Sequence, residues 1–189
     1  MTQASSSKQD PPCVRRLRKI DILDQPAEAL IYSTNVFLSC SGGVGGALVD
    51  RYGAGVQEML YGMLPAAARR GRAAQGSIFE GTLPTMPYRQ VFHTVPADIW
   101  QNTTPEVVER VLAAALGRCV ELGLRSVALS ALATGFGHMM LDDFLLLADR
   151  LLSAPAFQAI PEVTLCINDP PSYALALRLL ESRHLKLRL

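Results

Sequence analysis

The chain has 189 residues, 49% of them apolar, and its 18 Lys and Arg against 17 Asp and Glu give a formal net charge of +1. This length suits one well-filled core and is short for two, and so small a net charge provides no field to attract nucleic acid or a membrane surface. The cysteines, at positions 13, 40, 119 and 166, form no C-x-x-C pair, which disfavours a disulfide framework and a metal site and fits a reducing, cytoplasmic compartment.

The first thirteen residues are polar and Ser-rich, without an apolar stretch. A secretory signal peptide needs such a stretch, and a membrane-spanning helix needs about eighteen consecutive apolar residues, which the sequence lacks. We therefore expect a disordered segment over 1–13, then a single domain over 14–189 with no membrane partner.

Strand and helix patterns alternate through the first half of this domain. Apolar and basic residues alternate over 14–21 as in a half-exposed strand, and 28–35 is an apolar run with a polar end. Residues 46–71 carry apolar side chains at helical spacing and predict two helices. Two β-rich segments, 77–83 and 89–97, flank a Pro-containing turn, so we expect them to be neighbouring strands.

The second half continues the alternation. Residues 103–123 predict a helix with Thr104 as N-cap and Pro105 in its first turn. The remaining elements are expected to be strands over 126–132 and 162–168, helices over 141–154 and 171–183, and a final edge strand over 185–189. Strands that alternate with helices in this way predict a layered α/β domain with a mostly parallel central sheet.

Two glycine-rich loops follow predicted strands. The first contains four glycines within 42–46, and the second contains Gly135 and Gly137. In α/β folds, ligands bind beyond the carboxyl ends of strands, where the free N–H groups of helix N-termini favour anions. Neither a G-x-G-x-x-G fingerprint nor a G-K-[ST] phosphate loop occurs. We expect the two loops to clamp one phosphate-containing ligand, and the alternative is that both are only tight turns.

Three stretches of the chain carry motifs in a fixed order: "IDILDQPAEALIYSTNVFLSCSGGVGGAL" (20–48), "YRQVFHTV" (88–95) and "SVALSALATGFG" (126–137). They resemble the G-D-I, N-A-A-N and G-G-G-V-D-G-A-I elements, the P-x-x-V-I-H-x-V strand and the S-I-A-F-P-A-I-G-T-G-x-x-G loop of macrodomains, the ADP-ribose-binding family. The resemblance implies a three-layer α/β/α fold around a central, mostly parallel mixed sheet. It also implies that the partner is ADP-ribose or an ADP-ribosylated protein, with no cofactor.

The resemblance assigns roles to individual residues. Asp21 would accept a hydrogen bond from the adenine amino group, helped by the backbone of Ile22, and Asn35 would bind the distal ribose hydroxyls. The alternatives are that Asp21 only closes a strand and that Asn35 only caps a turn. Asn168 stands where many macrodomains have an aromatic residue that stacks on adenine. The other expected contacts to ADP-ribose come from the two glycine loops: Gly42, Gly43, Val44, Gly45, Ala133, Thr134, Gly135, Phe136 and Gly137.

The departures from the family pattern concern catalysis. Gly45 replaces the Asp that follows G-G-V in the hydrolytic branch, and Val49 stands where that branch often has a His, so a general base is missing there. Asp50, Cys40 and His138 are candidate substitutes in a carboxylate or Cys-His mechanism. Three hypotheses therefore remain. The chain is a binding module for ADP-ribose, a mono-ADP-ribosyl hydrolase or ADP-ribose ester processing enzyme with non-standard residues, or a diverged scaffold for another nucleotide.

Overall fold

A central sheet organises the computed structural model, which describes residues 13–64 and 71–188. Its six strands are β1 (Val14–Arg18), β2 (Ala29–Ser33), β3 (Ile78–Glu80), β4 (Gln90–Thr94), β5 (Ser126–Ser130) and β6 (Glu162–Cys166). They lie in the order β1-β6-β5-β2-β4-β3, and every neighbouring pair is parallel except β3 with β4. The predicted mostly parallel mixed sheet is confirmed, as is the adjacency of the two β-rich segments around the Pro-containing turn.

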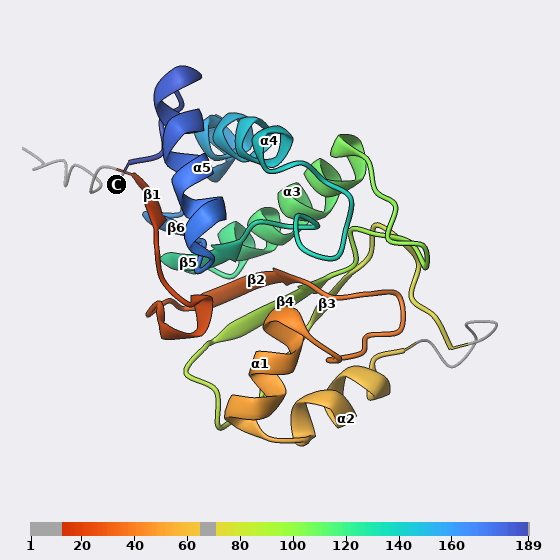
Figure 1. The fold of residues 1–189 in the computed structure, drawn as a ribbon. Coiled ribbons are helices and arrows are strands. Elements are labelled where there is room, and N and C mark those ends of the chain that lie inside the picture. Colours follow the sequence, from red (N-terminus) through yellow and green to blue (C-terminus); the bar gives the residue numbers. More distant parts are fainter. Residues whose placement is uncertain (1–12, 65–70, 189) are drawn as a thin grey trace, which may run out of the picture.

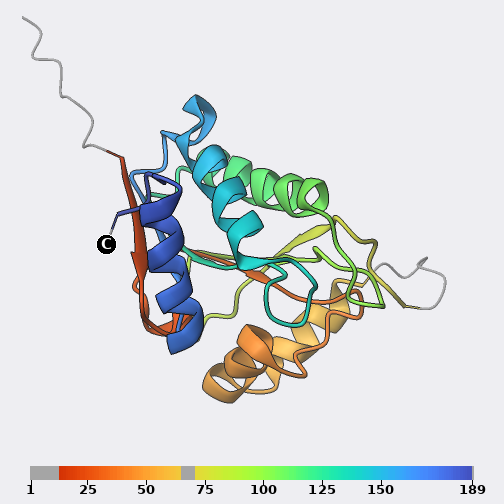
Figure 2. The same ribbon diagram turned by 45° about the horizontal axis from the view of Figure 1, so that its top comes forward.

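Helices cover both faces of this sheet (Figures 1 and 2). One face carries α3 (Pro105–Glu121), α4 (Leu141–Ser153) and α5 (Pro170–Ser182), and the other carries α1 (Gly43–Tyr52) and α2 (Gly55–Gly62). Two short 3-10 helices, η1 (Ile22–Asp24) and η2 (Pro155–Phe157), complete the described elements. Buried apolar side chains form two separate clusters, one against each face. The expected three-layer α/β/α arrangement is confirmed.

The helix boundaries follow local signals. The Thr104 side chain accepts a hydrogen bond from the N–H of Val107, with Pro105 at the first helical position of α3, as predicted. Asp169 does the same for α5 by accepting from the N–H of Ser172. α1 begins at Gly43, earlier than expected, so most of the glycine cluster belongs to its first turn rather than to a loop. No side chain caps the N-terminus of α1, so its first turn is held by backbone hydrogen bonds alone.

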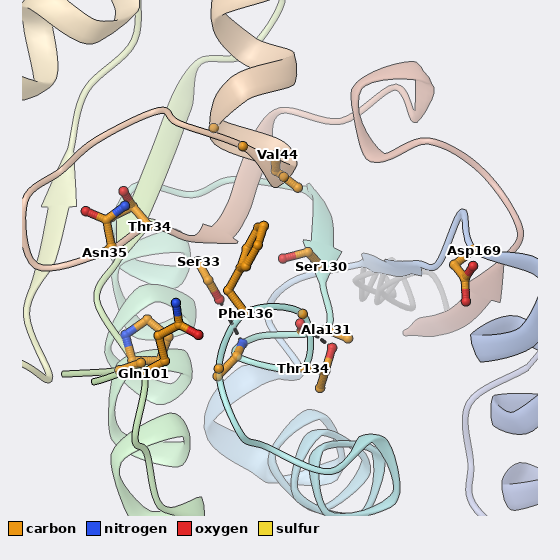
Figure 3. A pocket seen from close by; sticks show the side chains of 18 of the residues that line it. Ser33, Thr34, Asn35, Val44, Gln101, Ser130, Ala131, Thr134, Phe136 and Asp169 are labelled. Carbon is orange, nitrogen blue, oxygen red and sulfur yellow. Dashed lines mark hydrogen bonds between the residues drawn. The ribbon is translucent and has the colours of Figure 1, made fainter. Parts of the chain in front are cut away.

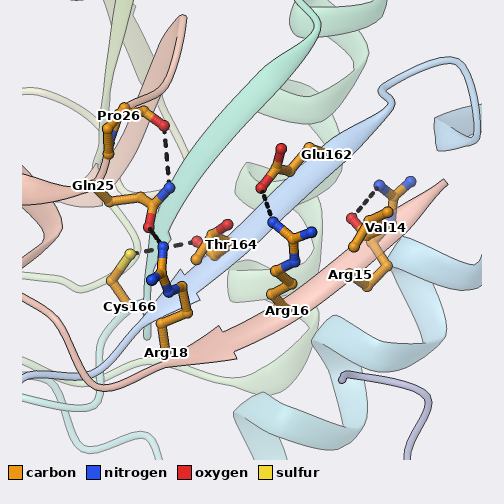
Figure 4. A network of polar contacts seen from close by, with 9 residues as sticks. All are labelled: Val14, Arg15, Arg16, Arg18, Gln25, Pro26, Glu162, Thr164 and Cys166. Atoms are coloured by element: carbon orange, nitrogen blue, oxygen red, sulfur yellow. Dashed lines mark hydrogen bonds and ion pairs between the residues drawn. The ribbon is translucent and has the colours of Figure 1, made fainter. Parts of the chain in front are cut away.

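β1 lies at one edge of the sheet, and its two faces differ. Arg15 is buried, and its guanidinium donates to the carbonyl oxygens of Leu152 (3.2 Å), Ile160 (2.9 Å) and Phe157 (2.9 Å) near the end of α4. Arg16 faces the other way and pairs with Glu162 at 2.6 Å in a partly exposed position (Figure 4). The strand predicted to be half-exposed thus buries one of its basic residues. Burial of this charged guanidinium is tolerated because three carbonyl oxygens accept its hydrogen bonds.

The chain ends bear on two further predictions. The expected disordered segment over 1–13 lies outside the described residues except for Cys13, whose Sγ donates to the carbonyl oxygen of Ile160 at 3.1 Å. The expected final strand is reduced to one parallel bridge between Arg188 and Arg16, and residue 189 lies outside the described part. In the described ranges, no helix is both long enough and apolar enough to cross a membrane.

Candidate functional site

A cavity of about 650 Å³ opens beyond the carboxyl ends of the central strands. Its wall is built by the segments that follow β2, β4, β5 and β6, the first of which runs into the start of α1, so four separate parts of the chain meet there (Figure 3). A smaller cavity of about 300 Å³ adjoins it and shares Gly43, Val44, Ser130, Cys166 and Asn168 with it. Together they offer room for a ligand the size of a dinucleotide.

Every residue predicted to bind the ligand lines one of these two cavities. Asp21 and Ile22 line the smaller cavity, at one end of the site. Asn35 and the loop 133–137 line the larger one, and the first glycine loop lies between the two ends. The fold therefore brings the predicted residues together, and their contacts with a ligand stay a prediction.

The first turn of α1 presents unpaired backbone donors. Within 13–64 and 71–188, no residue accepts a hydrogen bond from the N–H of Gly43, Val44 or Gly45. The first bond of the turn runs from the N–H of Gly46 to the carbonyl oxygen of Gly42 at 3.0 Å. The free N–H groups and the helix dipole at such a start stabilise an anion.

The loop after β5 presents a second set of donors. Its Ala133 adopts a left-handed conformation (φ 61°), and its N–H donates to Ser33 Oγ at 2.9 Å. A Cβ on Gly137 would lie 2.5 Å from the carbonyl oxygen of Ala133, so only glycine fits there. No described residue accepts from the N–H of Gly135, Phe136 or Gly137. Three successive free N–H groups in a tight loop make a concave anion site.

Phe136 connects the two sets of donors. It points from the second loop toward the start of α1 (Figure 3), and a Cβ on Gly42 or Gly43 would lie 3.6 or 3.9 Å from its ring. Phe136 is 71% exposed and so does not belong to the apolar core. The ring of Phe136 thus lies within ordinary contact distance of the first loop, beside the cavity.

The two polar residues expected to recognise the ends of the ligand also hold local turns. Asp21 Oδ1 caps η1 by accepting from the N–H of Leu23 at 2.9 Å, and no described residue donates to its other oxygen. Asn35 Oδ1 accepts from the N–H groups of Phe37 (3.0 Å) and Ser39 (3.1 Å), while Nδ2 donates to the carbonyl oxygen of Ser39 (2.9 Å). The turn-capping alternative therefore describes Asn35, which keeps one N–H for a ligand.

The candidate substitutes for the missing catalytic residues do not line either cavity. Asp50 is exposed on α1, and His138 is exposed with Nδ1 3.4 Å from Asn102 Oδ1. Cys40 lies behind the first loop, where burial raises the pKa of its thiol and disfavours the thiolate needed by a nucleophile. A Cβ on Gly45 would lie 3.3 Å from Cys40 Cα, so an aspartate at position 45 would crowd this backbone.

The sequence interpretation did not select Asp98 or Gln101, which lie in the segment between β4 and α3. Asp98 and Gln101 line the larger cavity from there. Asp98 Oδ1 accepts from the N–H groups of Asn102 and Trp100, at 2.8 Å each, and these bonds lower the pKa of the Asp98 carboxyl. Gln101 adopts a left-handed conformation (φ 65°). The available signal was that Pro, Asp, Asn and Thr cluster directly after a strand, at the edge of the sheet where ligands bind.

A family model described as Macro domain matches residues 31–147, which include both glycine loops. The chain belongs to the macro domain family. A macro domain-containing protein of Streptomyces griseus is 28% identical over 170 residues, or 86% of this chain and 91% of that protein. A similar protein of Streptomyces nogalater is 30% identical over 166 residues, or 81% and 84%. An uncharacterised protein of Mycobacterium bovis is 29% identical over 127 residues, and this macro domain spans only 34% of its length.

Solved macrodomains share the fold. The Oceanobacillus iheyensis macrodomain with ADP has a TM-score of 0.72 at 20% identity, covering 89% of this chain and 90% of that one. A mutant of the same protein with ADPR, the abbreviation of ADP-ribose, has a TM-score of 0.71 at 20% identity, covering 89% and 92%. The macrodomain of Thermus aquaticus DarG has a TM-score of 0.64 at 24% identity, covering 80% and 97%. These likenesses establish the macro domain fold for this chain.

Proposed function

We propose that this macro domain binds ADP-ribose, free or attached to a protein, and holds its diphosphate between the two glycine loops. The proposal rests on two groups of backbone N–H donors that have no acceptor among the described residues. They lie over 43–45 and 135–137 and border the same cavity. Backbone donors that are already oriented stabilise phosphate charge without needing a net positive protein. The complexes of related macrodomains with ADP and ADP-ribose support the choice of ligand.

The adjoining cavities suit the two ends of this ligand. In the smaller cavity, the free carboxylate oxygen of Asp21 would accept from the adenine amino group, and apolar contact would come from Ile22, Val44 and Ala47. In the larger cavity, the end lined by Asn35 would hold the distal ribose. Asn168 borders both cavities without an aromatic ring, so adenine would rest on the apolar walls rather than on a stacking partner.

The proposal is for binding rather than hydrolysis. Asp98 and Asp169 are the aspartates that line the larger cavity, and each accepts hydrogen bonds from its own turn. These bonds lower the pKa of both carboxyl groups, chiefly through Asn102 for Asp98 and through Ser172 for Asp169. A carboxylate with a lowered pKa is a weaker general base. Both side chains therefore suit a structural role.

The central test introduces a charge into the proposed diphosphate site. Gly42 has extended backbone (φ 171°), and a Cβ there makes only ordinary contact with Phe136, so the fold should accept a side chain. We expect calorimetry to show saturable binding of ADP-ribose, and Gly42→Glu to weaken it at least about tenfold more than the neutral, equally large Gly42→Gln. Equal effects of the two variants would place the diphosphate elsewhere. Absence of binding to the unchanged protein would reject the function.

A second variant tests the adenine end. Asp21→Asn keeps an oxygen that can accept from the N–H of Leu23, so η1 should remain capped, but the side chain loses its charge. We expect weaker binding of ADP-ribose and AMP and unchanged binding of ribose 5-phosphate. If all three ligands weakened equally, Asp21 would not be reading the base.

A further inference from the structure

We infer that Gln101, rather than Asn35, supplies the side-chain amide that recognises the hydroxyls of the distal ribose. This inference rests on the proposed function and names the residue that distinguishes ADP-ribose from ADP. Asn35 and Gln101 each place a side-chain amide at the larger cavity. The fold already uses the hydrogen-bonding groups of the Asn35 amide, whereas those of the Gln101 amide are available.

Asn35 has little capacity left. A side-chain amide recognises a pair of neighbouring hydroxyls best when its oxygen accepts from one and its N–H donates to the other. Both lone pairs of Asn35 Oδ1 are taken by the N–H groups of Phe37 and Ser39, and one of its own N–H groups is given to Ser39. Asn35 can therefore donate one bond to a hydroxyl and accept none.

Gln101 has its full capacity. Within the described part of the chain, no group donates to or accepts from its side-chain amide. The residue lines the larger cavity, on the same side as Asn35 and Thr34, and its side chain extends toward Ser33 and Phe136 (Figure 3). Gln101 therefore borders the same cavity as Phe136, whose ring lies against the first glycine loop.

The backbone of Gln101 is held in place by contacts on either side. Its N–H donates to the carbonyl oxygen of Asp98 at 3.1 Å, and its own carbonyl oxygen accepts from the N–H of His138 at 3.2 Å. The next residue, Asn102, is tied to Asp98 Oδ1 and to Gln75 Nε2. These bonds maintain the left-handed conformation of Gln101, which a non-glycine residue adopts only when its surroundings enforce it. A backbone that is already fixed beside the cavity reduces the entropy that this residue loses when it binds a ligand.

The experiment compares ADP with ADP-ribose, which differ in the distal ribose. Gln101→Gly removes the amide at a position where glycine is the residue best suited to the backbone, so the fold should persist, as thermal melting will verify. We expect roughly fivefold to tenfold weaker binding of ADP-ribose with unchanged binding of ADP. Gln101→Asn, with a shorter amide and tolerance of the left-handed conformation, should recover part of the loss. Asn35→Ala, which loosens the first loop, should weaken both ligands by a similar factor.

The outcomes separate this inference from the proposed function. If Gln101→Gly leaves ADP-ribose binding unchanged, or weakens ADP and ADP-ribose equally, the assignment to Gln101 is wrong while the proposed function stands. If the unchanged protein binds neither ligand, both are wrong. If Asn35→Ala selectively weakens ADP-ribose and Gln101→Gly does not, the distal ribose is read by Asn35 after all.

Discussion

Ser33 Oγ accepts a hydrogen bond from the backbone N–H of Ala133 at 2.9 Å and thereby joins the end of β2 to the loop after β5. Ala133 is held in the left-handed region (φ 61°), which is unfavourable for alanine unless neighbouring contacts maintain it. The same loop carries the free N–H groups over 135–137. A side chain that belongs to one half of the chain thus sets the conformation of donors in the other half.

Removal of this hydroxyl should loosen the second loop. We expect Ser33→Ala to weaken ADP-ribose binding about fivefold, because one hydrogen bond contributes about 1 kcal/mol. Ser33→Thr keeps a hydroxyl and should recover most of the affinity. If Ser33→Ala and Ser33→Thr bind with equal affinity in calorimetry, the hydroxyl does not hold the loop.

Two glycines of the same loop provide a matched pair. A Cβ on Gly137 would lie 2.5 Å from the carbonyl oxygen of Ala133, whereas a Cβ on Gly135 would meet nothing within 4 Å. We expect Gly137→Ala to lower the free energy of unfolding by about 1–3 kcal/mol, since the crowded backbone must shift, and Gly135→Ala to change it by less than about 0.5 kcal/mol. Urea titration without ligand measures both. Equal stabilities would contradict the packing described for this loop.

Two consecutive arginines of β1 allow a second comparison between matched variants. The buried guanidinium of Arg15 donates to carbonyl groups of Leu152, Phe157 and Ile160, so Arg15→Met would leave buried oxygens without donors. We expect a loss of about 2–4 kcal/mol in the free energy of unfolding. Arg16→Met removes a partly exposed pair with Glu162 and should cost about 0–1 kcal/mol. Chemical denaturation of both variants checks the contrast, and a larger loss for Arg16→Met would reverse the assignment.

Acid should destabilise the protein through His93. Its Nε2 lies 3.1 Å from the carbonyl oxygen of Gly81, which can only accept, so Nδ1 accepts the bond from Tyr32 Oη at 2.7 Å. Burial lowers the pKa of His93 from 6.5 to about 4. Between these values the unfolded chain binds a proton that the folded protein excludes. The free energy of unfolding should therefore fall as the pH falls, by at most about 1.4 kcal/mol per pH unit from this group.

The control for this pH dependence is His93→Gln. This variant should be less stable at pH 7, because it loses the buried bonds of the imidazole, but its stability should change less between pH 6.5 and 4. Urea unfolding at several pH values gives the two slopes. Identical slopes would show that other groups cause the acid sensitivity.

Local patterns in the sequence were sufficient for much of the fold. The alternation of strands and helices, the capping of α3 by Thr104 and the position of two glycine loops after strands all depend on neighbouring residues, and the structure agrees with them. The expected glycine loop was partly wrong, because α1 already begins at Gly43. Periodicity and capping predicted these features because their physical causes act within a few residues.

The tertiary structure alone decided which polar groups remain available. Asn35 was expected to bind a ligand, yet its amide is largely used by its own turn, while Gln101 attracted no attention in the sequence and keeps a free amide beside the cavity. The strand over 14–21 was expected to be half-exposed, yet its Arg15 is buried and donates to carbonyl groups of residues distant in sequence. The partners of Arg15 are distant in sequence and those of Asn35 belong to its own turn, but in both cases the residue type predicts only what a side chain can donate or accept. Only the folded chain determines whether that capacity is already satisfied.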